Sequence, residues 1–223
     1  MMRLARVVVP GIPHHVTQRG NRRQTAFFND GDYQASRDLM AERCACHGVE
    51  VWAYCLMPHQ VHLIAIPTSE DGLRRVIGEA HRRYTRRINA REESLGHPWQ
   101  GRFASFPMDE AHLLIAVRYV ELNPVLAGLV KNAGNWPWSS AAAYLKGADD
   151  GLVGVWPLLE RITDWRAFLD ASLGDGETET VRRHARTGRP LGDNDFVAGL
   201  EKKLKRALGP HKRGRKPKNK PGN

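Results

Sequence analysis

Two apolar runs separated by a short proline-containing turn constrain the fold more than any other stretch of this chain. Apolar side chains alternate along residues 49–57, and the apolar pattern resumes over residues 61–66. Successive side chains of a strand point to opposite faces, so each run predicts a β-strand. Residues 58–60, which begin with Pro58, are the expected hairpin turn. The chain therefore must contain an antiparallel sheet.

Helices are expected on either side of this hairpin. Residues 30–47 precede Gly48, which is a typical C-terminal stop. Residues 71–89 place apolar side chains three or four positions apart, which indicates a core-facing stripe. These are Leu73, Ile77, Ala80, Tyr84 and Ile88. We interpret Tyr84 as a core residue for this reason.

A third helix is expected from a cap at Asp109 to about Leu122. The residue before Pro124 is disfavoured in the α region, and Pro124 can itself open a further short helix through Val130. At the other end of the chain, residues 6–17 predict an extended segment that leads into a polar loop at 18–24.

Composition indicates one main domain with an appendage. A chain of 223 residues with 41% hydrophobic content can bury a core. The sequence has neither a stretch of about 18 apolar residues nor a secretory signal, so we expect a cytoplasmic protein without a membrane segment. Its three cysteines do not have the spacing of a zinc site, which favours reduced thiols. We place the main domain at 1–148, a small helical accessory region at 149–210, and a basic, disordered tail at 211–223.

Positive charge is concentrated where nucleic acid could use it. The net charge is +10, and residues 201–223 hold 10 Lys and Arg against the single acid Glu201. Basic segments of this kind suit a polyanionic backbone, although a solvated tail without a partner has the same composition. The side chains that we expect to contact DNA are Arg19, Arg22, Arg23, Arg75, Arg82, Arg83, Arg86, Gln100, Arg102, Lys212, Arg213, Arg215 and Lys216.

Two short motifs carry possible chemistry. His59, Gln60 and His62 gather metal-capable side chains at the predicted hairpin. Tyr119 and Asn123 have helical i,i+4 spacing, so both lie on one helix face. A phenolate near a cation is a competent nucleophile for a phosphodiester, because the cation neutralises phosphate charge. A metal-assisted tyrosine nucleophile is the resulting hypothesis.

These motifs, taken in order, resemble those of the REP-associated tyrosine transposases, which belong to the HUH single-tyrosine insertion-sequence transposases. The matching segments are 57–64, 99–103, 118–130 and 136–140, within a resemblance that covers roughly residues 5–145. The basic residues 188–218 are similar to the C-terminal extension of many members.

The resemblance implies an α+β fold with a ferredoxin-like antiparallel sheet, and a small helical, basic C-terminal extension. It also implies that single-stranded or hairpin DNA is cleaved and rejoined through a 5′-phosphotyrosine on Tyr119. The implied cofactor is a divalent cation, Mg²⁺ or Mn²⁺, held by Gln60, His62 and Asn123. The protein would act near the nucleoid as a monomer or a homodimer.

The family pattern of histidine, bulky apolar residue and histidine is altered here, because Gln60 takes the place of the first histidine. A glutamine oxygen can ligate a hard cation, and on a strand Gln60 and His62 share a face. His59 would face the other way unless a bulge intervened, so the strand period favours Gln60 while His59 stays an alternative. Asn123 could instead cap its helix before Pro124.

Three functions are therefore open to this chain. It can be an active transposase, a catalytically weakened relative that binds DNA hairpins, or an RNA-hairpin-binding protein that uses the same basic surfaces. His14 and His15 fall in the segment that helps to recognise DNA in the wider superfamily. We expect each to be a packed or solvent-facing histidine.

Overall fold

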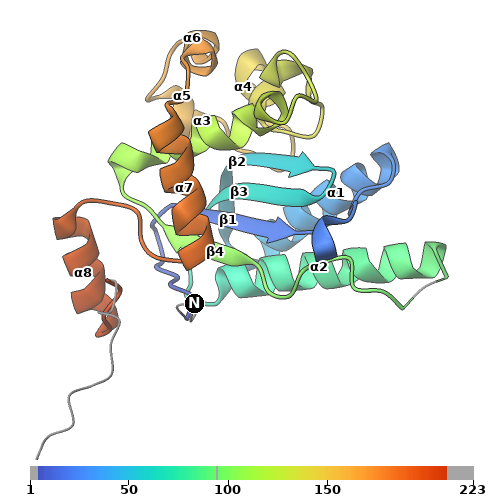
Figure 1. Cartoon of the computed structure of the whole chain (residues 1–223), viewed down its shortest axis with the longest axis horizontal. Helices are drawn as coiled ribbons and strands as arrows, with labels where there is room; N and C mark the ends of the chain where they lie inside the picture. The colour runs from blue at the N-terminus through green and yellow to red at the C-terminus, as the bar shows by residue number, and fades with distance from the viewer. Residues whose placement is uncertain (1–4, 94, 210–223) are drawn as a thin grey trace, which may run out of the picture.

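A computed structural model describes residues 5–93 and 95–209, and it contains a four-stranded antiparallel sheet with helices on both faces (Figure 1). The strands are β1 (His14–Arg19), β2 (Val49–Met57), β3 (Gln60–Pro67) and β4 (Ala104–Pro107), in the spatial order β2-β3-β1-β4. This strand order, with one helix after β1 and another after β3, is the ferredoxin-like arrangement. It confirms the expected α+β class.

Helices and 3-10 turns lie between the strands and after the last strand. They are η1 (Asn21–Arg23), α1 (Asp30–His47), α2 (Gly72–Arg91), α3 (Glu110–Leu126), η2 (Ala133–Asn135), α4 (Ala141–Lys146), α5 (Trp156–Leu159), α6 (Trp165–Asp170), α7 (Asp175–Thr187) and α8 (Asn194–Leu204). Gly48 ends α1 at a φ of 60°, in the left-handed region that the sequence predicted for it. None of the helices in the described residues is both long and apolar enough to cross a membrane.

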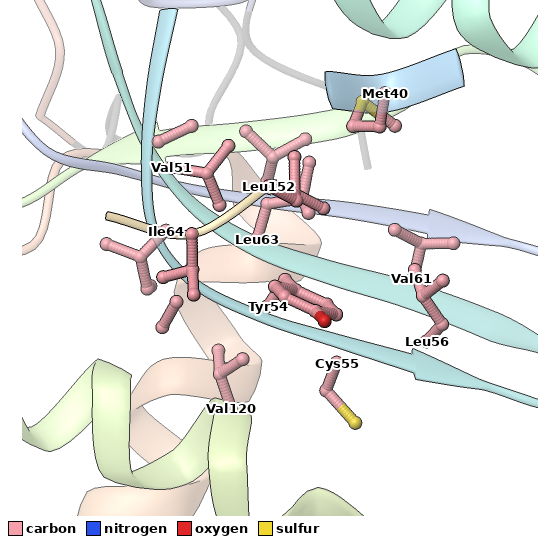
Figure 2. Packing of buried hydrophobic residues seen from close by; sticks show 14 of the residues in the cluster. Met40, Val51, Tyr54, Cys55, Leu56, Val61, Leu63, Ile64, Val120 and Leu152 are labelled. Carbon is pink, nitrogen blue, oxygen red and sulfur yellow. The ribbon is translucent and has the colours of Figure 1, made fainter. Parts of the chain in front are cut away.

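The core lies between the sheet and the helices on its two faces. α1 and α2 pack against each other and cover one face, while α3 packs on β2 and β3. Figure 2 shows Met40 of α1 and Val120 of α3 approaching the strands from opposite sides. Leu56, Leu63 and Ile64 are buried between these layers. Because both faces are covered, β3 is apolar at almost every position.

The bounds of the hairpin turn and of β1 differ from the sequence predictions. The hairpin turn contains only Pro58 and His59, because Gln60 already pairs with Met57 and with Arg19. β1 covers only His14–Arg19, so it starts later than the predicted extended segment and includes the start of the predicted polar loop.

The third helix does not end before Pro124, which lies inside α3. The missing N–H of Pro124 costs one bond near the end of the helix, and the helix stops within one turn at Leu126. The prediction of a separate helix that begins at Pro124 is therefore wrong. Residues 175–179, which are rich in acidic side chains, form the first turns of α7.

Residues beyond 149 pack on the same core as the sheet. Trp165, Phe168, Leu169 and Val181 are buried in the core cluster that contains the strands. α8 lies further out and closes a second small cluster with the segment before β1, where Val9 and Leu200 are buried. The division at residue 148 stays a prediction, and the tail from 210 onward lies outside the described residues.

Candidate active site

His62 lies on the face of the sheet that α3 covers. Its opposite neighbours are Thr17 on β1 and Cys55 on β2. Only 4% of the side chain is exposed, and within the described residues its Nε2 is buried without a hydrogen-bond partner. Burial is the main cause that holds the pKa of His62 well below its usual range, and the neighbouring His15 and the charge of Arg19 lower it further. The imidazole is therefore neutral and has a lone pair to offer.

The other ring nitrogen of His62 is held by His15. Nδ1 of His62 is 3.0 Å from Nε2 of His15, and the two rings stack with centroids 5.3 Å apart. Burial lowers the pKa of His15 to about 3, so this imidazole is also neutral. If Nε2 of His62 is to bind a cation, its proton must lie on Nδ1 and be donated to His15. The pair can fix that tautomer.

Tyr119 completes this cluster from α3. Its ring centroid is 5.8 Å from that of His62 and 6.0 Å from that of His15, and both contacts are edge-on. The side chain is 5% exposed. The structure thus brings the predicted nucleophile to the predicted metal histidine, although the two residues are 57 positions apart in the sequence.

Asn123 is one helical turn after Tyr119 and is buried beside it. Its Nδ2 donates a hydrogen bond of 2.9 Å to the Tyr119 carbonyl. Because a carbonyl oxygen can only accept, the Asn123 amide nitrogen must face the Tyr119 carbonyl, and Oδ1 is the side-chain atom left available to a cation. The position is inside α3, whose C-cap is Ala127, so the alternative role of Asn123 as the helix cap does not apply.

Gln60 and His59 have different surroundings at the start of β3. Gln60 pairs with Arg19, two residues from His62 in the strand, and it shares the His62 face. His59 lies in the turn, and its carbonyl accepts a hydrogen bond from the Gly20 amide. Burial, Arg19 and Arg23 lower the pKa of His59. These contacts do not distinguish which of the two side chains would bind the cation, so Gln60 and His59 stay alternative ligands.

The donors at this site fit a hard divalent cation. The described residues hold no cluster of three or more His, Cys, Asp or Glu side chains that could bind a metal. One buried imidazole with an unpartnered Nε2 and two amide side chains remain, and amide oxygens are ligands of Mg²⁺ and Mn²⁺. The set would lack a carboxylate, so we expect weak binding.

Three loops meet at the Gln60 end of the sheet. The Gly20 amide bonds to His59, the Asn21 amide donates 2.7 Å to the Pro98 carbonyl, and the Gln100 amide donates 2.8 Å to the Arg19 carbonyl. These bonds bring the predicted DNA-contacting loops into one surface. That surface carries Arg19, Arg22, Arg23, Gln100 and Arg102.

Arg22 and Arg23 have φ angles of 51° and 61°, a left-handed conformation that is unusual for non-glycine residues. Both side chains are exposed. The hydrogen bonds on either side of η1 hold this short segment in place, with the Gln24 amide donating 2.8 Å to the Asn21 carbonyl. The two guanidinium groups are thus presented at the Gln60 end by a constrained backbone.

The arginines of α2 do not join this surface. α2 covers the opposite face of the sheet from Tyr119, and most of these arginines have acidic partners. Arg75 pairs with Asp71 at 2.5 Å and Arg83 with Glu42 at 2.7 Å. Arg82 lies 3.6 Å from Glu79. Acidic side chains therefore already neutralise most of the α2 arginines that were expected to contact DNA, although Arg86 forms no ion pair within the described residues. Lys212, Arg213, Arg215 and Lys216 lie outside the described residues.

Sequence reasoning missed two contributors to the site. His15 was expected to be an ordinary packed or exposed histidine, and only the register of β1 on β3 shows that it reaches His62. The second is Arg182 on α7, whose charge contributes to the low pKa of His62. The run of arginines at 182–186 was visible in the sequence, but nothing local indicated which strand it would approach.

The chain is similar in sequence and in fold to known transposases. Residues 8–123 match the model of a protein family described as IS200-like transposases. A solved structure described as a REP-associated tyrosine transposase bound to a REP hairpin superposes with a TM-score of 0.57 and 23% identity, over 69% of this chain and 92% of that one. A putative transposase from Deinococcus radiodurans R1 gives 0.38 and 19%, over 49% of this chain and 88% of that one. No curated protein matches the chain.

Proposed function

The chain belongs to the IS200-like transposase family, and from this premise we propose that it cleaves and rejoins single-stranded or hairpin DNA with Tyr119 as the nucleophile. The observation that carries the proposal is the position of the Tyr119 ring, which is edge-on to both His15 and His62. This arrangement puts a phenol against two neutral imidazoles, and the buried Asn123 follows Tyr119 by one helical turn. The REP-associated branch is part of the proposal, since the solved relative supports the shared fold.

The proposed reaction is a transfer of one phosphodiester bond. The Tyr119 hydroxyl loses its proton, its Oη forms a bond to phosphorus, and the bond from phosphorus to the 3′-oxygen breaks. The departing 3′-oxygen takes up a proton, which leaves a free 3′-OH and a 5′-phosphotyrosine. The reverse step, with a 3′-OH as the nucleophile, rejoins DNA. No hydrolysis or nucleotide cofactor is needed because the covalent link conserves the phosphodiester.

Protein groups position this reaction. The hydrogen bond between His15 and His62 fixes the His62 ring, and the bond from Asn123 to the Tyr119 carbonyl fixes the Asn123 amide. Gln60, His62 and Asn123 would hold the cation, with His59 as the alternative to Gln60. Bound there, Mg²⁺ or Mn²⁺ would neutralise charge on the non-bridging phosphate oxygens.

The substrate is proposed from the surface around the cluster. Arg19, Arg22, Arg23 and Arg102 are exposed at the end of the sheet where Gln60 lies. A guanidinium group can bind phosphate in a bidentate manner, so this surface suits a DNA backbone. Hairpin recognition is proposed because a relative of the same fold was solved with a REP hairpin.

A metal-dependent covalent adduct tests the proposal directly. Labelled hairpin and single-stranded DNA are incubated with the protein and Mn²⁺, and adducts are separated on a denaturing gel. We expect an adduct that disappears in Tyr119→Phe and persists in Tyr84→Phe. Tyr84 is a matched control because it is a buried tyrosine whose hydroxyl bonds to the Ala26 carbonyl at 2.5 Å, away from the site. An adduct that survives in Tyr119→Phe would rule out Tyr119 as the nucleophile.

A binding protein without cleavage is the second candidate function. One observation favours it: the metal set contains a single imidazole, because Gln60 stands where the family has histidine. Tight hairpin binding without an adduct in the same assay would support this function. If RNA of the same sequence competes as well as DNA, the substrate would instead be an RNA hairpin.

A further inference from the structure

A cleft of about 280 Å³ opens beside β1 and β4 on the face that carries His62. Thr17 and Ala104, which are opposite each other in the sheet, lie in its lining. Arg19 and Arg102 line it from the loops at the Gln60 end, while Ala185 and Arg186 line it from α7. Thr17 is also the direct neighbour of His62 on β3, so the cleft lies beside the candidate active site.

The α7 side of this cleft is fixed to the sheet. Val181 is fully buried in the core, and the His184 ring lies 5.7 Å from that of Phe106 on β4. After the helix, Leu191 forms a bridge with Met108, and its amide donates 2.9 Å to the Pro107 carbonyl. α7 therefore has a defined place over the strands (Figure 1).

Two arginines of α7 are on the cleft side of the helix. Arg182 and Arg186 are separated by four residues, so they share a helix face, and both are exposed. Arg186 lines the cleft, and Arg182 lies about one helical turn before it on α7. Arg183 is on the side of the helix opposite Val181, so it points away from the sheet.

From this placement we propose that α7 is a DNA-binding wall of the active-site cleft, with Arg182 and Arg186 contacting phosphates of the single strand next to the scissile bond. The inference deepens the proposed function and rests on it. It extends the strand-binding surface beyond the part that matches the family, since that match ends at residue 123. The accessory region would then take part in substrate binding instead of serving only as a scaffold.

Charge complementarity supports a strand of DNA as the occupant. Arg19, Arg102 and Arg186 give the cleft three guanidinium groups, and its described lining includes no acidic side chain. Arg186 has an ion pair with Glu179 at 2.5 Å, in which both side chains are 59% exposed. An exposed pair of this kind is weak, so a phosphate can displace the carboxylate. Glu179 would then restrain Arg186 when DNA is absent.

The salt dependence of binding tests the proposal without requiring cleavage. The full-length Tyr119→Phe protein is titrated with a fluorescent hairpin that carries a single-stranded extension, at several salt concentrations. Each phosphate contact on single-stranded DNA contributes a slope of about 0.7 in log K against log salt. We expect Arg182→Ala and Arg186→Ala each to lower the slope by about that amount, while Arg183→Ala, a matched loss of charge on the same helix, leaves it unchanged.

Three further comparisons complete the test. Arg186→Lys should restore most of the slope, since the charge is kept, and Glu179→Gln should tighten binding. A hairpin without the extension should show no difference between Arg183→Ala and the two cleft variants. Equal slopes for all three alanine variants on the extended hairpin would overturn the α7 proposal. In that case Arg102→Ala should still weaken binding, because Arg102 belongs to the proposed DNA surface at the Gln60 end. Failure of the unsubstituted protein to bind any DNA would overturn the proposed function as well, so the two failures are distinguishable.

Discussion

The imidazoles of His15 and His62 are joined across β1 and β3 by a hydrogen bond of 3.0 Å between Nε2 and Nδ1. The bond is diagonal in the sheet, because the direct partner of His62 is Thr17. It occupies one nitrogen of His62 and leaves the other, Nε2, buried without a partner within the described residues. A histidine held in this way has its ring orientation set before any cation arrives.

Replacing His15 tests whether this orientation matters. His15→Phe keeps a ring against Phe106 but removes the nitrogen that faces His62. We expect the affinity for Mn²⁺ to fall about 10- to 100-fold, which is typical of losing an outer partner of a metal histidine. Calorimetric titration of Mn²⁺ measures it, and His15→Gln should recover part of the loss because its amide oxygen can accept from Nδ1. Equal affinities for the unsubstituted and His15→Phe proteins would contradict the orienting role.

Substitutions at Gln60 and His59 decide between the two possible ligands. Gln60→His should tighten Mn²⁺ binding, because an imidazole is a stronger donor than an amide oxygen for this ion. Gln60→Ala should weaken it, and His59→Ala should leave it unchanged. The His59 variant is a fair control because the turn is held by the backbone of His59, whose carbonyl accepts from Gly20 at 2.7 Å. A larger loss in His59→Ala than in Gln60→Ala would assign the ligand to His59.

Much of the fold was predictable because its signals are local. The alternation at 49–57 and the stripe from Leu73 to Ile88 gave a strand and a helix close to their observed bounds. α7 was not recognised, since only Val181 is buried along its 13 residues and its first turns are acidic. Its helical state depends on packing against β4, which the sequence does not display.

The candidate site was predictable where its residues have fixed spacing. Gln60 and His62 share a strand, and Tyr119 and Asn123 share a helix face, so each pair follows from a period. His15 could not be found in this way, because its partner is 47 residues away and only strand register brings them together. One shift of that register would turn His15 to the opposite face.

The accessory region should stabilise the helix that carries Tyr119. Trp165 donates a bond of 2.8 Å from Nε1 to the buried Glu121 carboxylate on α3. Trp165→Phe keeps an aromatic ring against Tyr144 but leaves one carboxylate oxygen unpaired, which we expect to cost about 1–3 kcal/mol of unfolding free energy. Urea denaturation measures it, with Trp156→Phe as the control, because Trp156 is 69% exposed. Similar losses in both variants would show that the bond is not needed.

Acid should destabilise the protein through His81, which stacks on Trp99 with ring centroids 4.4 Å apart. Burial lowers the pKa of His81 to about 3. An unfolded histidine takes up a proton below about pH 6.5, so the unfolded state binds more protons between these values and stability falls as the pH falls from 6.5 towards 3. The full destabilisation is on the order of 5 kcal/mol, and almost none of it is present above pH 7.

The variant His81→Leu isolates this contribution. Urea unfolding at pH 7.5 and pH 5 gives the loss of stability on acidification for each protein. We expect the loss to be smaller in His81→Leu by roughly 2 kcal/mol, because 1.5 pH units of the linkage are removed at about 1.4 kcal/mol each. The control is His97→Leu, since His97 is exposed and is solvated in both states. If His81→Leu and His97→Leu change the acid sensitivity equally, the buried His81 imidazole is not the source of that sensitivity. Other buried histidines would then be its source, such as His14, because burial lowers the pKa of His14 to about 4.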